Sequence, residues 1–147
     1  MQVICRRPLL ILILFSLAIA TIGCGDAKMA KVTGTVTYKD KLVPNAHVSF
    51  TPVGGGQIAS GLTDQNGRFV LGTMGKDDGA LVGQHKIHVI ARGPGRPLRP
   101  GEIGSGLPSD EAPGDPIIPA KYFTPETSGL THEVVRGSND VPLTLTD

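Results

Sequence analysis

The chain has 147 residues, of which 39% are hydrophobic and 18% are charged, and its formal net charge is +1. That length suits one domain, and a near-neutral charge gives no electrostatic footprint for nucleic acid or anionic lipid. The 20 glycines, 12 prolines and absence of Trp indicate a core of aliphatic side chains, many turns and few rings on which a sugar could stack.

The N-terminus carries an export signal. Arg6 and Arg7 precede an uncharged apolar run over 9–22, which is shorter than the roughly 20 residues of a spanning helix and typical of a signal-peptide core. The run ends at Gly23-Cys24, and polar residues follow. We predict a signal peptide over 1–23 with cleavage between Gly23 and Cys24. An uncleaved membrane anchor and an ordinary signal peptide with an incidental cysteine are the alternatives.

A small residue directly before a cysteine at the end of such a run resembles the lipobox of bacterial lipoproteins, although Thr21 stands where Leu is usual. The resemblance implies that Cys24 is acylated with palmitate-type chains and becomes the first mature residue. Cys5 would leave with the signal, so Cys24 has no partner for an internal disulfide. Two or three acyl chains anchor a protein firmly. The expected location is a membrane of the bacterial cell envelope, inner or outer, with residues 24–30 as lipidated cysteine and tether.

The mature chain shows the period-two alternation of half-buried strands. Over residues 32–38, Val32, Val36 and Tyr38 fall on one face and three threonines on the other. Residues 46–51 alternate in the same way, with Ala46, Val48 and Phe50 pointing inward. Further strands are expected at 58–63, 68–71, 83–91, 131–135 and 141–146. The predicted fold is all-β: a single antiparallel Greek-key β-sandwich of about seven strands over 31–147.

The stretch Asp64-Gln65-Asn66-Gly67 admits two interpretations, a calcium loop or a tight turn. An EF-hand loop beginning at Asp64 would need an oxygen ligand at its fifth position and a bidentate acid at its twelfth, where this chain has Arg68 and Gly75. A turn needs only Asp at its start and Gly at a position of positive φ. We predict a structural turn formed by Asp64, Asn66 and Gly67, and no metal.

Residues 93–119 interrupt the rhythm of the strands. They hold seven of the twelve prolines and six glycines, with no apolar periodicity. Such a composition buries little apolar surface, so disorder with local polyproline character is expected. A long loop in a compact domain can also be functional. The alternative is that this loop closes as a lid over one sheet and binds a small ligand or glycan.

Several motifs resemble the carboxypeptidase regulatory-like (transthyretin-like) domain of bacterial envelope proteins. They are V-x-G-x-V-x-Y at 32–38, P-N-A-x-V-x-F at 44–50, T-D-x-x-G-x-F at 63–69 and G-x-x-x-I-x-V at 83–89. Residues 118–131 are similar to those of a subgroup of small single-domain lipoproteins. The resemblance covers nearly all of 31–147. It implies a seven-stranded sandwich and, for most relatives, no catalysis. His85 stands where a Tyr is often found.

The four histidines raise the question of a metal site. His85 and His88 are three apart on one expected strand and therefore point to opposite faces. His47 lies on an outward face, and His132 is expected at the start of a strand. No zinc site is predicted from this spacing, and no cofactor is expected.

No nucleophile–base motif stands out. The acidic pairs Asp77-Asp78 and Asp110-Glu111 are expected in solvated turns. Arg136-Gly137-Ser138 resembles the C-terminal tripeptide of transthyretin-like hydroxyisourate hydrolases, but here a strand follows it, so a hairpin turn is expected. The sequence predicts a lipid-anchored, non-enzymatic binding or structural module. The membrane is its first partner, an envelope protein or glycan is a possible second, and an enzyme is the weakest alternative.

Overall fold

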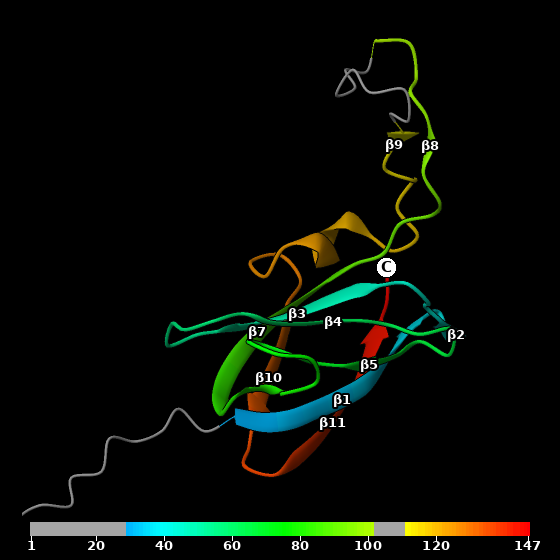
Figure 1. Cartoon of the computed structure of the whole chain (residues 1–147). Helices are drawn as coiled ribbons and strands as arrows, with labels where there is room; N and C mark the ends of the chain where they lie inside the picture. The colour runs from blue at the N-terminus through cyan, green and yellow to red at the C-terminus, as the bar shows by residue number, and fades with distance from the viewer. Residues whose placement is uncertain (1–28, 102–110) are drawn as a thin grey trace, which may run out of the picture.

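The computed structural model describes residues 29–101 and 111–147, which fold into two β-sheets packed face to face and a separate two-stranded ribbon (Figure 1). The strands are β1 (Met29–Tyr38), β2 (Lys41–Leu42), β3 (His47–Pro52), β4 (Ala59–Leu62), β5 (Arg68–Val70), β6 (Ala80–Leu81), β7 (Gly83–Ile90), β8 (Arg96–Pro97), β9 (Glu111–Ala112), β10 (Leu130–Val134) and β11 (Ser138–Leu145), with a 3₁₀ turn η1 (Ala120–Phe123). The all-β prediction is confirmed. Seven of these strands have three or more residues. Within the described ranges, no helix is long and apolar enough to cross a bilayer.

The first sheet is built around β1. β11 pairs along one edge, from Lys31 opposite Ser138 to Tyr38 opposite Leu145. β6, β5 and β2 pair in turn along the other edge, each antiparallel to β1. The β1–β11 pair is parallel, so the prediction of a wholly antiparallel sandwich is wrong at this edge. The reason is that the chain leaves β10 in the other sheet and crosses between the sheets before β11, instead of returning beside a neighbouring strand.

The second sheet has the order β10-β7-β3-β4, and every pair in it is antiparallel. β4 also reaches the first sheet, because Ser60 and Gly72 exchange two backbone hydrogen bonds of 2.8 and 2.9 Å. The two sheets are therefore joined by backbone hydrogen bonds along one side.

The core lies between the sheets, and the predicted alternation places it well. Val32 and Val36 of β1 are completely buried, as are Ala46, Val48 and Phe50. The glycine of the V-x-G-x-V motif has a packing reason. A Cβ at Gly34 would lie 2.6 Å from Cζ of Phe69, and closer still to the carbonyl of Val141. A side chain there would push Phe69 out of the core.

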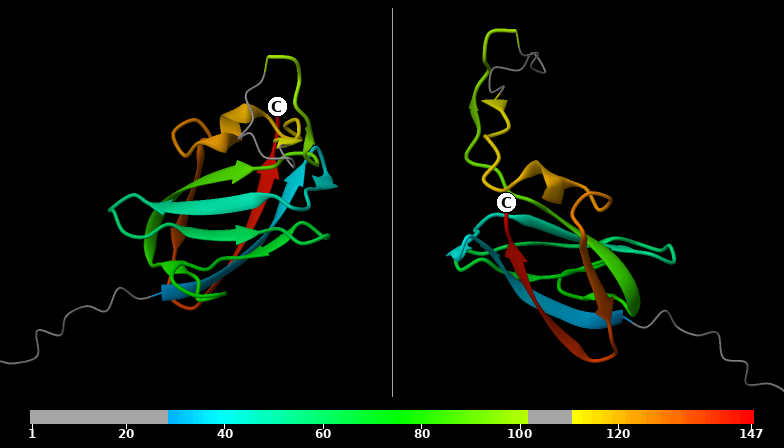
Figure 2. Two further views of the ribbon diagram at one scale, coloured as in Figure 1. Left: turned by 45° about the horizontal axis from the view of Figure 1, so that its top comes forward. Right: turned by 180° about the vertical axis from the view of Figure 1, so that it is seen from behind.

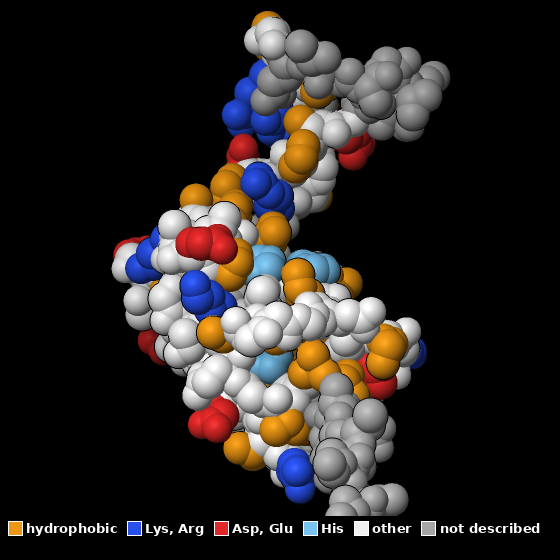
Figure 3. All heavy atoms as spheres, turned by 90° about the vertical axis from the view of Figure 1, so that its left-hand side faces the viewer, with side chains coloured by type: hydrophobic (Ala, Val, Ile, Leu, Met, Phe, Trp, Pro, Cys, Tyr) orange, Lys and Arg blue, Asp and Glu red, His pale blue; other side chains and the backbone are white. Residues whose placement is uncertain are grey.

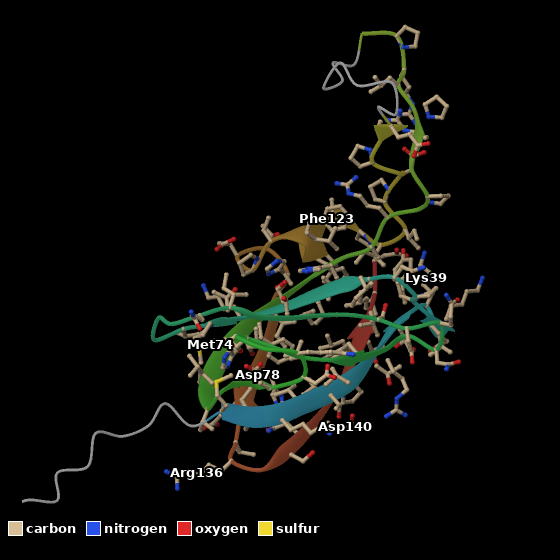
Figure 4. All side chains as sticks on the ribbon, viewed as in Figure 1. Lys39, Met74, Asp78, Phe123, Arg136 and Asp140 are labelled. Atoms are coloured by element: carbon tan, nitrogen blue, oxygen red, sulfur yellow. The ribbon has the colours of Figure 1, made fainter. Side chains whose placement is uncertain are left out.

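The sandwich has two distinct ends (Figure 2). β1 begins at one end, which we call the tether end, where Met29 pairs with Leu81. The C-terminus and residues 93–101 and 111–117 lie at the opposite end, which we call the arm end, where Lys39 Nζ lies 2.7 Å from Asp147 Oδ2. Figure 4 shows Arg136 at the tether end and Lys39 at the arm end.

Residues 93–101 and 111–117, which we call the arm, form a ribbon that projects away from both sheets (Figures 1 and 2). β8 pairs with β9, and the Gly93 N–H donates to the Asp115 carbonyl at 2.9 Å. Gly114 lies so close to the Gly93 and Pro94 carbonyls that a Cβ there would collide with them, and the absence of a side chain lets the two backbones approach. Backbone pairing and prolines with a fixed φ hold these flanks in this geometry. The disorder expected for 93–119 stays a prediction. The middle of the predicted loop, 102–110, lies outside the described residues.

Candidate functional site

Gly23 and Cys24, the predicted cleavage and lipidation residues, lie outside the described residues. Their roles stay predictions. Met29, the first described residue, already belongs to β1, and Ala30 is 3% exposed. Residues 29 and 30, the last two of the predicted tether over 24–30, therefore belong to the sandwich.

The stretch Asp64–Gly67 forms a turn held by the Asp64 side chain. Asp64 Oδ1 accepts hydrogen bonds from the backbone N–H of Asn66 at 2.8 Å and of Arg68 at 2.9 Å. Gly67 has φ +67°, and its N–H donates to the Asp64 carbonyl at 3.0 Å. This geometry is an Asx-type turn. Asp64 Oδ1 is thus committed to backbone amides, as the turn requires.

The acidic pair Asp77-Asp78 is more than a solvated turn. The Asp78 carboxylate accepts hydrogen bonds from the backbone N–H of Thr73, Met74 and Gly75, at 2.6, 3.1 and 2.8 Å. These bonds, of which the one from Thr73 has the largest effect, lower the pKa of Asp78 because they stabilise its charged form. Asp78 therefore fixes the loop between β5 and β6, near the tether end (Figure 4). Glu111 of the other pair is exposed in β9, and Asp110 lies outside the described residues.

The turn Arg136-Gly137-Ser138 joins the two sheets and is not a hairpin, which corrects the prediction. β10 and β11 lie in different sheets. Asn139 closes this crossing, because its Oδ1 accepts from the Val135 N–H at 3.0 Å and its Nδ2 donates to the Val135 and Lys31 carbonyls at 2.9 and 3.2 Å. Gly137, with φ +100°, makes the turn possible.

An open groove of about 730 Å³ runs outside β4 and β5. Its apolar side chains are Leu62, Val70 and Met74, and its rim includes Arg68 and Asp77. The arm lines no part of it. Because the arm projects from the far end (Figure 1), its described residues cover neither this groove nor a sheet. The structure does not support the arm as a lid.

His47 of β3 and His88 of β7 lie on the outer face of the second sheet, opposite the buried positions of those strands. Figure 3 shows histidine side chains at the surface of the molecule. His47 is exposed and its Nδ1 lies 3.2 Å from Ser49 Oγ, which the alternation places on the same face. Ser49 is only 3% exposed, so the hydroxyl is not available to a substrate. Burial, and then the nearby His47, lowers the pKa of His88. This cluster has a Ser–His contact but not an accessible nucleophile.

The inner face of the same sheet brings together two other histidines. His85 of β7 and His132 of β10 are directly opposite each other in the antiparallel register. Directly opposed side chains share a face, with Cβ atoms roughly 4.5–5.5 Å apart. The Phe50 ring packs beside both, with its centroid 5.9 Å from His85 and 6.4 Å from His132. The sequence placed His132 at the start of a strand, whereas it is the third residue of β10.

Both of these imidazoles keep one nitrogen without a partner. His85 is 1% exposed, and its Nδ1 lies 2.9 Å from the Gly83 carbonyl. A carbonyl only accepts, so Nδ1 carries the proton and Nε2 carries the lone pair. Nε2 of His85 and Nε2 of His132 are buried without a hydrogen-bond partner in the described structure. Burial, the largest cause, lowers the pKa of His85, so the ring is neutral at pH 7.

A recess of about 310 Å³ opens onto His85. Three glycines line it, Gly54, Gly55 and Gly83, and a Cβ at any of them would meet no atom within 4 Å. Leu81, which pairs with Met29 at the start of β1, also lines the recess. It therefore opens at the tether end.

No protein-family model matches the chain, and no curated protein matches it significantly. Among solved structures, a DUF3823 family protein from Parabacteroides merdae is similar in 82% of this chain, with 16% identity and a TM-score of 0.39. The chain spans 47% of the length of that protein. A likeness at this TM-score carries no argument about fold or function.

Proposed function

We propose that the chain is a lipid-anchored β-sandwich of the bacterial cell envelope with a non-enzymatic binding or structural role. The observation that carries the proposal is the apolar run ending at Gly23-Cys24, close to the first strand of a small all-β domain. We further propose that the domain is of the carboxypeptidase regulatory-like (transthyretin-like) type, on the strength of its motifs at 32–38, 44–50, 63–69 and 83–89.

The position of β1 gives the anchored protein an orientation. Four residues separate Cys24 from Met29, and the chain between those two Cα atoms reaches at most roughly 18 Å. An acylated Cys24 therefore keeps the tether end close to the membrane. The arm, at the opposite end (Figure 2), then points away from the membrane toward an envelope protein or a glycan.

A non-enzymatic role is supported by the side chains that the sandwich brings together. The Ser49–His47 contact is closed to substrate by the burial of Ser49. The Asp78 and Asp64 carboxylates are occupied by backbone amides. These groups stabilise loops, and none of them is poised as a nucleophile or a base.

Two cysteine substitutions test the anchor, because Cys5 is predicted to leave with the signal peptide whereas Cys24 is predicted to be acylated. Cys24→Ala removes the acylated thiol, so the variant should run as an unlipidated protein and lose its lipid-dependent retention in the membrane fraction. Cys5→Ala lies inside the predicted signal and should fractionate like the wild type. The measurement is membrane fractionation with metabolic labelling by a fatty acid. Unchanged labelling of Cys24→Ala would defeat the proposal.

A further inference from the structure

We propose that His85 and His132 bind a monovalent copper ion, Cu(I), between their Nε2 atoms. The site is the inner-face histidine pair of the second sheet, which the register of β7 and β10 places side by side. It goes beyond the proposed function, because neither the anchor nor the arm requires a metal.

The donor atoms have the state that a metal requires. The Gly83 carbonyl holds the proton of His85 on Nδ1, so Nε2, which is buried, carries the lone pair. Histidine ligands commonly donate their other ring N–H to a backbone carbonyl in this way, which fixes the tautomer and the orientation of the ring. Nε2 of His85 and Nε2 of His132 are buried and unpartnered. A buried polar atom without a partner is costly, and a shared ion would satisfy both.

The number of ligands selects the class of metal. Within 29–101 and 111–147, no group of three or more His, Cys, Asp or Glu side chains converges on a metal position. Zn²⁺ sites usually take three or four protein ligands, so this pair does not suit Zn²⁺. Cu(I) has a filled d shell and accepts linear coordination by two ligands, and imidazole is among the ligands that suit copper.

The surroundings select the charge of the ion. The pair packs against Phe50, and Val134 next to it along β10 is fully buried. Two neutral imidazoles leave the full charge of the ion uncompensated, and burying charge in an apolar place is expensive. The cost rises with the square of the charge, so a monovalent ion is favoured over a divalent one.

The recess provides a route for the ion. It is lined by His85 together with three glycines, at which no side chain narrows it, and it lies at the tether end. A metal site needs such an entry path as well as its ligands.

The test uses the full chain in detergent, with Cys5→Ser and Cys24→Ser introduced so that thiols do not bind copper. Cu(I), kept reduced with ascorbate under nitrogen, is titrated in competition with the chelator bicinchoninate. The parent should withdraw one equivalent of Cu(I) from the chelator. His85→Tyr and His132→Phe keep an aromatic ring at each position and remove the donor nitrogen, so their affinity should fall by about 10- to 100-fold or more. His47→Ala/His88→Ala, on the outer face, is the matched control and should bind like the parent.

Two further measurements test the proposal. The first is the NMR spectrum of the parent's histidine rings, which requires no substitution at the site. Cu(I) should shift the imidazole resonances of His85 and His132 and leave those of His47 and His88. Zn²⁺ should bind at least about tenfold more weakly than Cu(I). The proposal is overturned if the parent takes no Cu(I) from the chelator, if the outer-face histidines shift instead, or if Zn²⁺ binds equally well.

Discussion

The sandwich and the arm are ordered by different interactions. The sandwich is held by fully buried side chains from both sheets, such as Val36, Phe50 and Phe69. The arm buries little apolar surface beyond Ala112 and is held by backbone pairing and the ion pair between Arg99 and Asp115, 3.1 Å apart. Burial of apolar area dominates stability, whereas exposed ion pairs contribute about 0–1 kcal/mol. The stability of the chain should therefore reside in the sandwich.

The largest effect should come from the centre of the core. Phe50→Ala removes a fully buried ring that touches Phe69, His85 and His132. The free energy of unfolding should fall by about 3–5 kcal/mol, because the site cannot collapse around the cavity. Val53→Ala, at a side chain 61% exposed, is the control and should change stability by less than about 0.5 kcal/mol. Urea denaturation measures both, and equal losses would contradict a core centred on Phe50.

A smaller loss is expected at Gly34, where β1 lies between its two neighbours β11 and β5 in the first sheet. Gly34→Ala adds one methyl group against Phe69 and the Val141 carbonyl, so it should cost about 1–3 kcal/mol through overpacking. Gly54→Ala is the matched control, since a Cβ at Gly54 meets nothing within 4 Å. Thermal melts of the two variants separate the positions. A neutral Gly34→Ala would show that Phe69 does not need this glycine.

Lowering the pH should reduce the free energy of unfolding of the sandwich. Burial holds the pKa of folded His85 below its ordinary value of 6.5, so the unfolded chain binds more protons in acid. Stability is then complete above pH 6.5 and is lost as the pH falls from there toward the folded pKa. His88 adds a contribution of the same sign. Urea melts across pH 5–8 should show a shallower slope for His85→Tyr than for the wild type, and identical slopes would contradict this assignment.

The smallest effect should come from the arm. Pro94 and Gly114 lie against each other at its base, so deletion of 95–113 can rejoin the chain there with little distortion. The free energy of unfolding should change by less than about 1 kcal/mol, because surface ion pairs and a long loop contribute little. Urea denaturation of the deletion variant beside the wild type measures it. A loss as large as that of Phe50→Ala would show that the arm supports the sandwich.

The strand pattern could be predicted because long strands such as β1, β7 and β11 bury alternate side chains. Alternation along β1 and β3 indicated which side chains point inward, and Phe50 and Val36 are buried as expected. The partners of the strands could not be predicted in the same way. The parallel pairing of β1 with β11 depends on the crossing closed by Asn139, and a period-two pattern contains no information about that crossing.

The histidine pair was missed for the same reason. The sequence indicated that His85 and His88 point to opposite faces, which holds in β7. It could not place His132 opposite His85, because this depends on the register between two strands that are far apart in the chain. The pairing between the flanks of the arm was missed because it is a tertiary property, which composition alone does not reveal.

The anchor is the claim on which the orientation and the role of the molecule depend. Mass spectrometry of the N-terminal peptide from protein purified out of membranes tests it most directly. The account predicts that the peptide begins at Cys24 and carries the added mass of its acyl chains. A peptide beginning at another residue, or Cys24 with a free thiol, would contradict it.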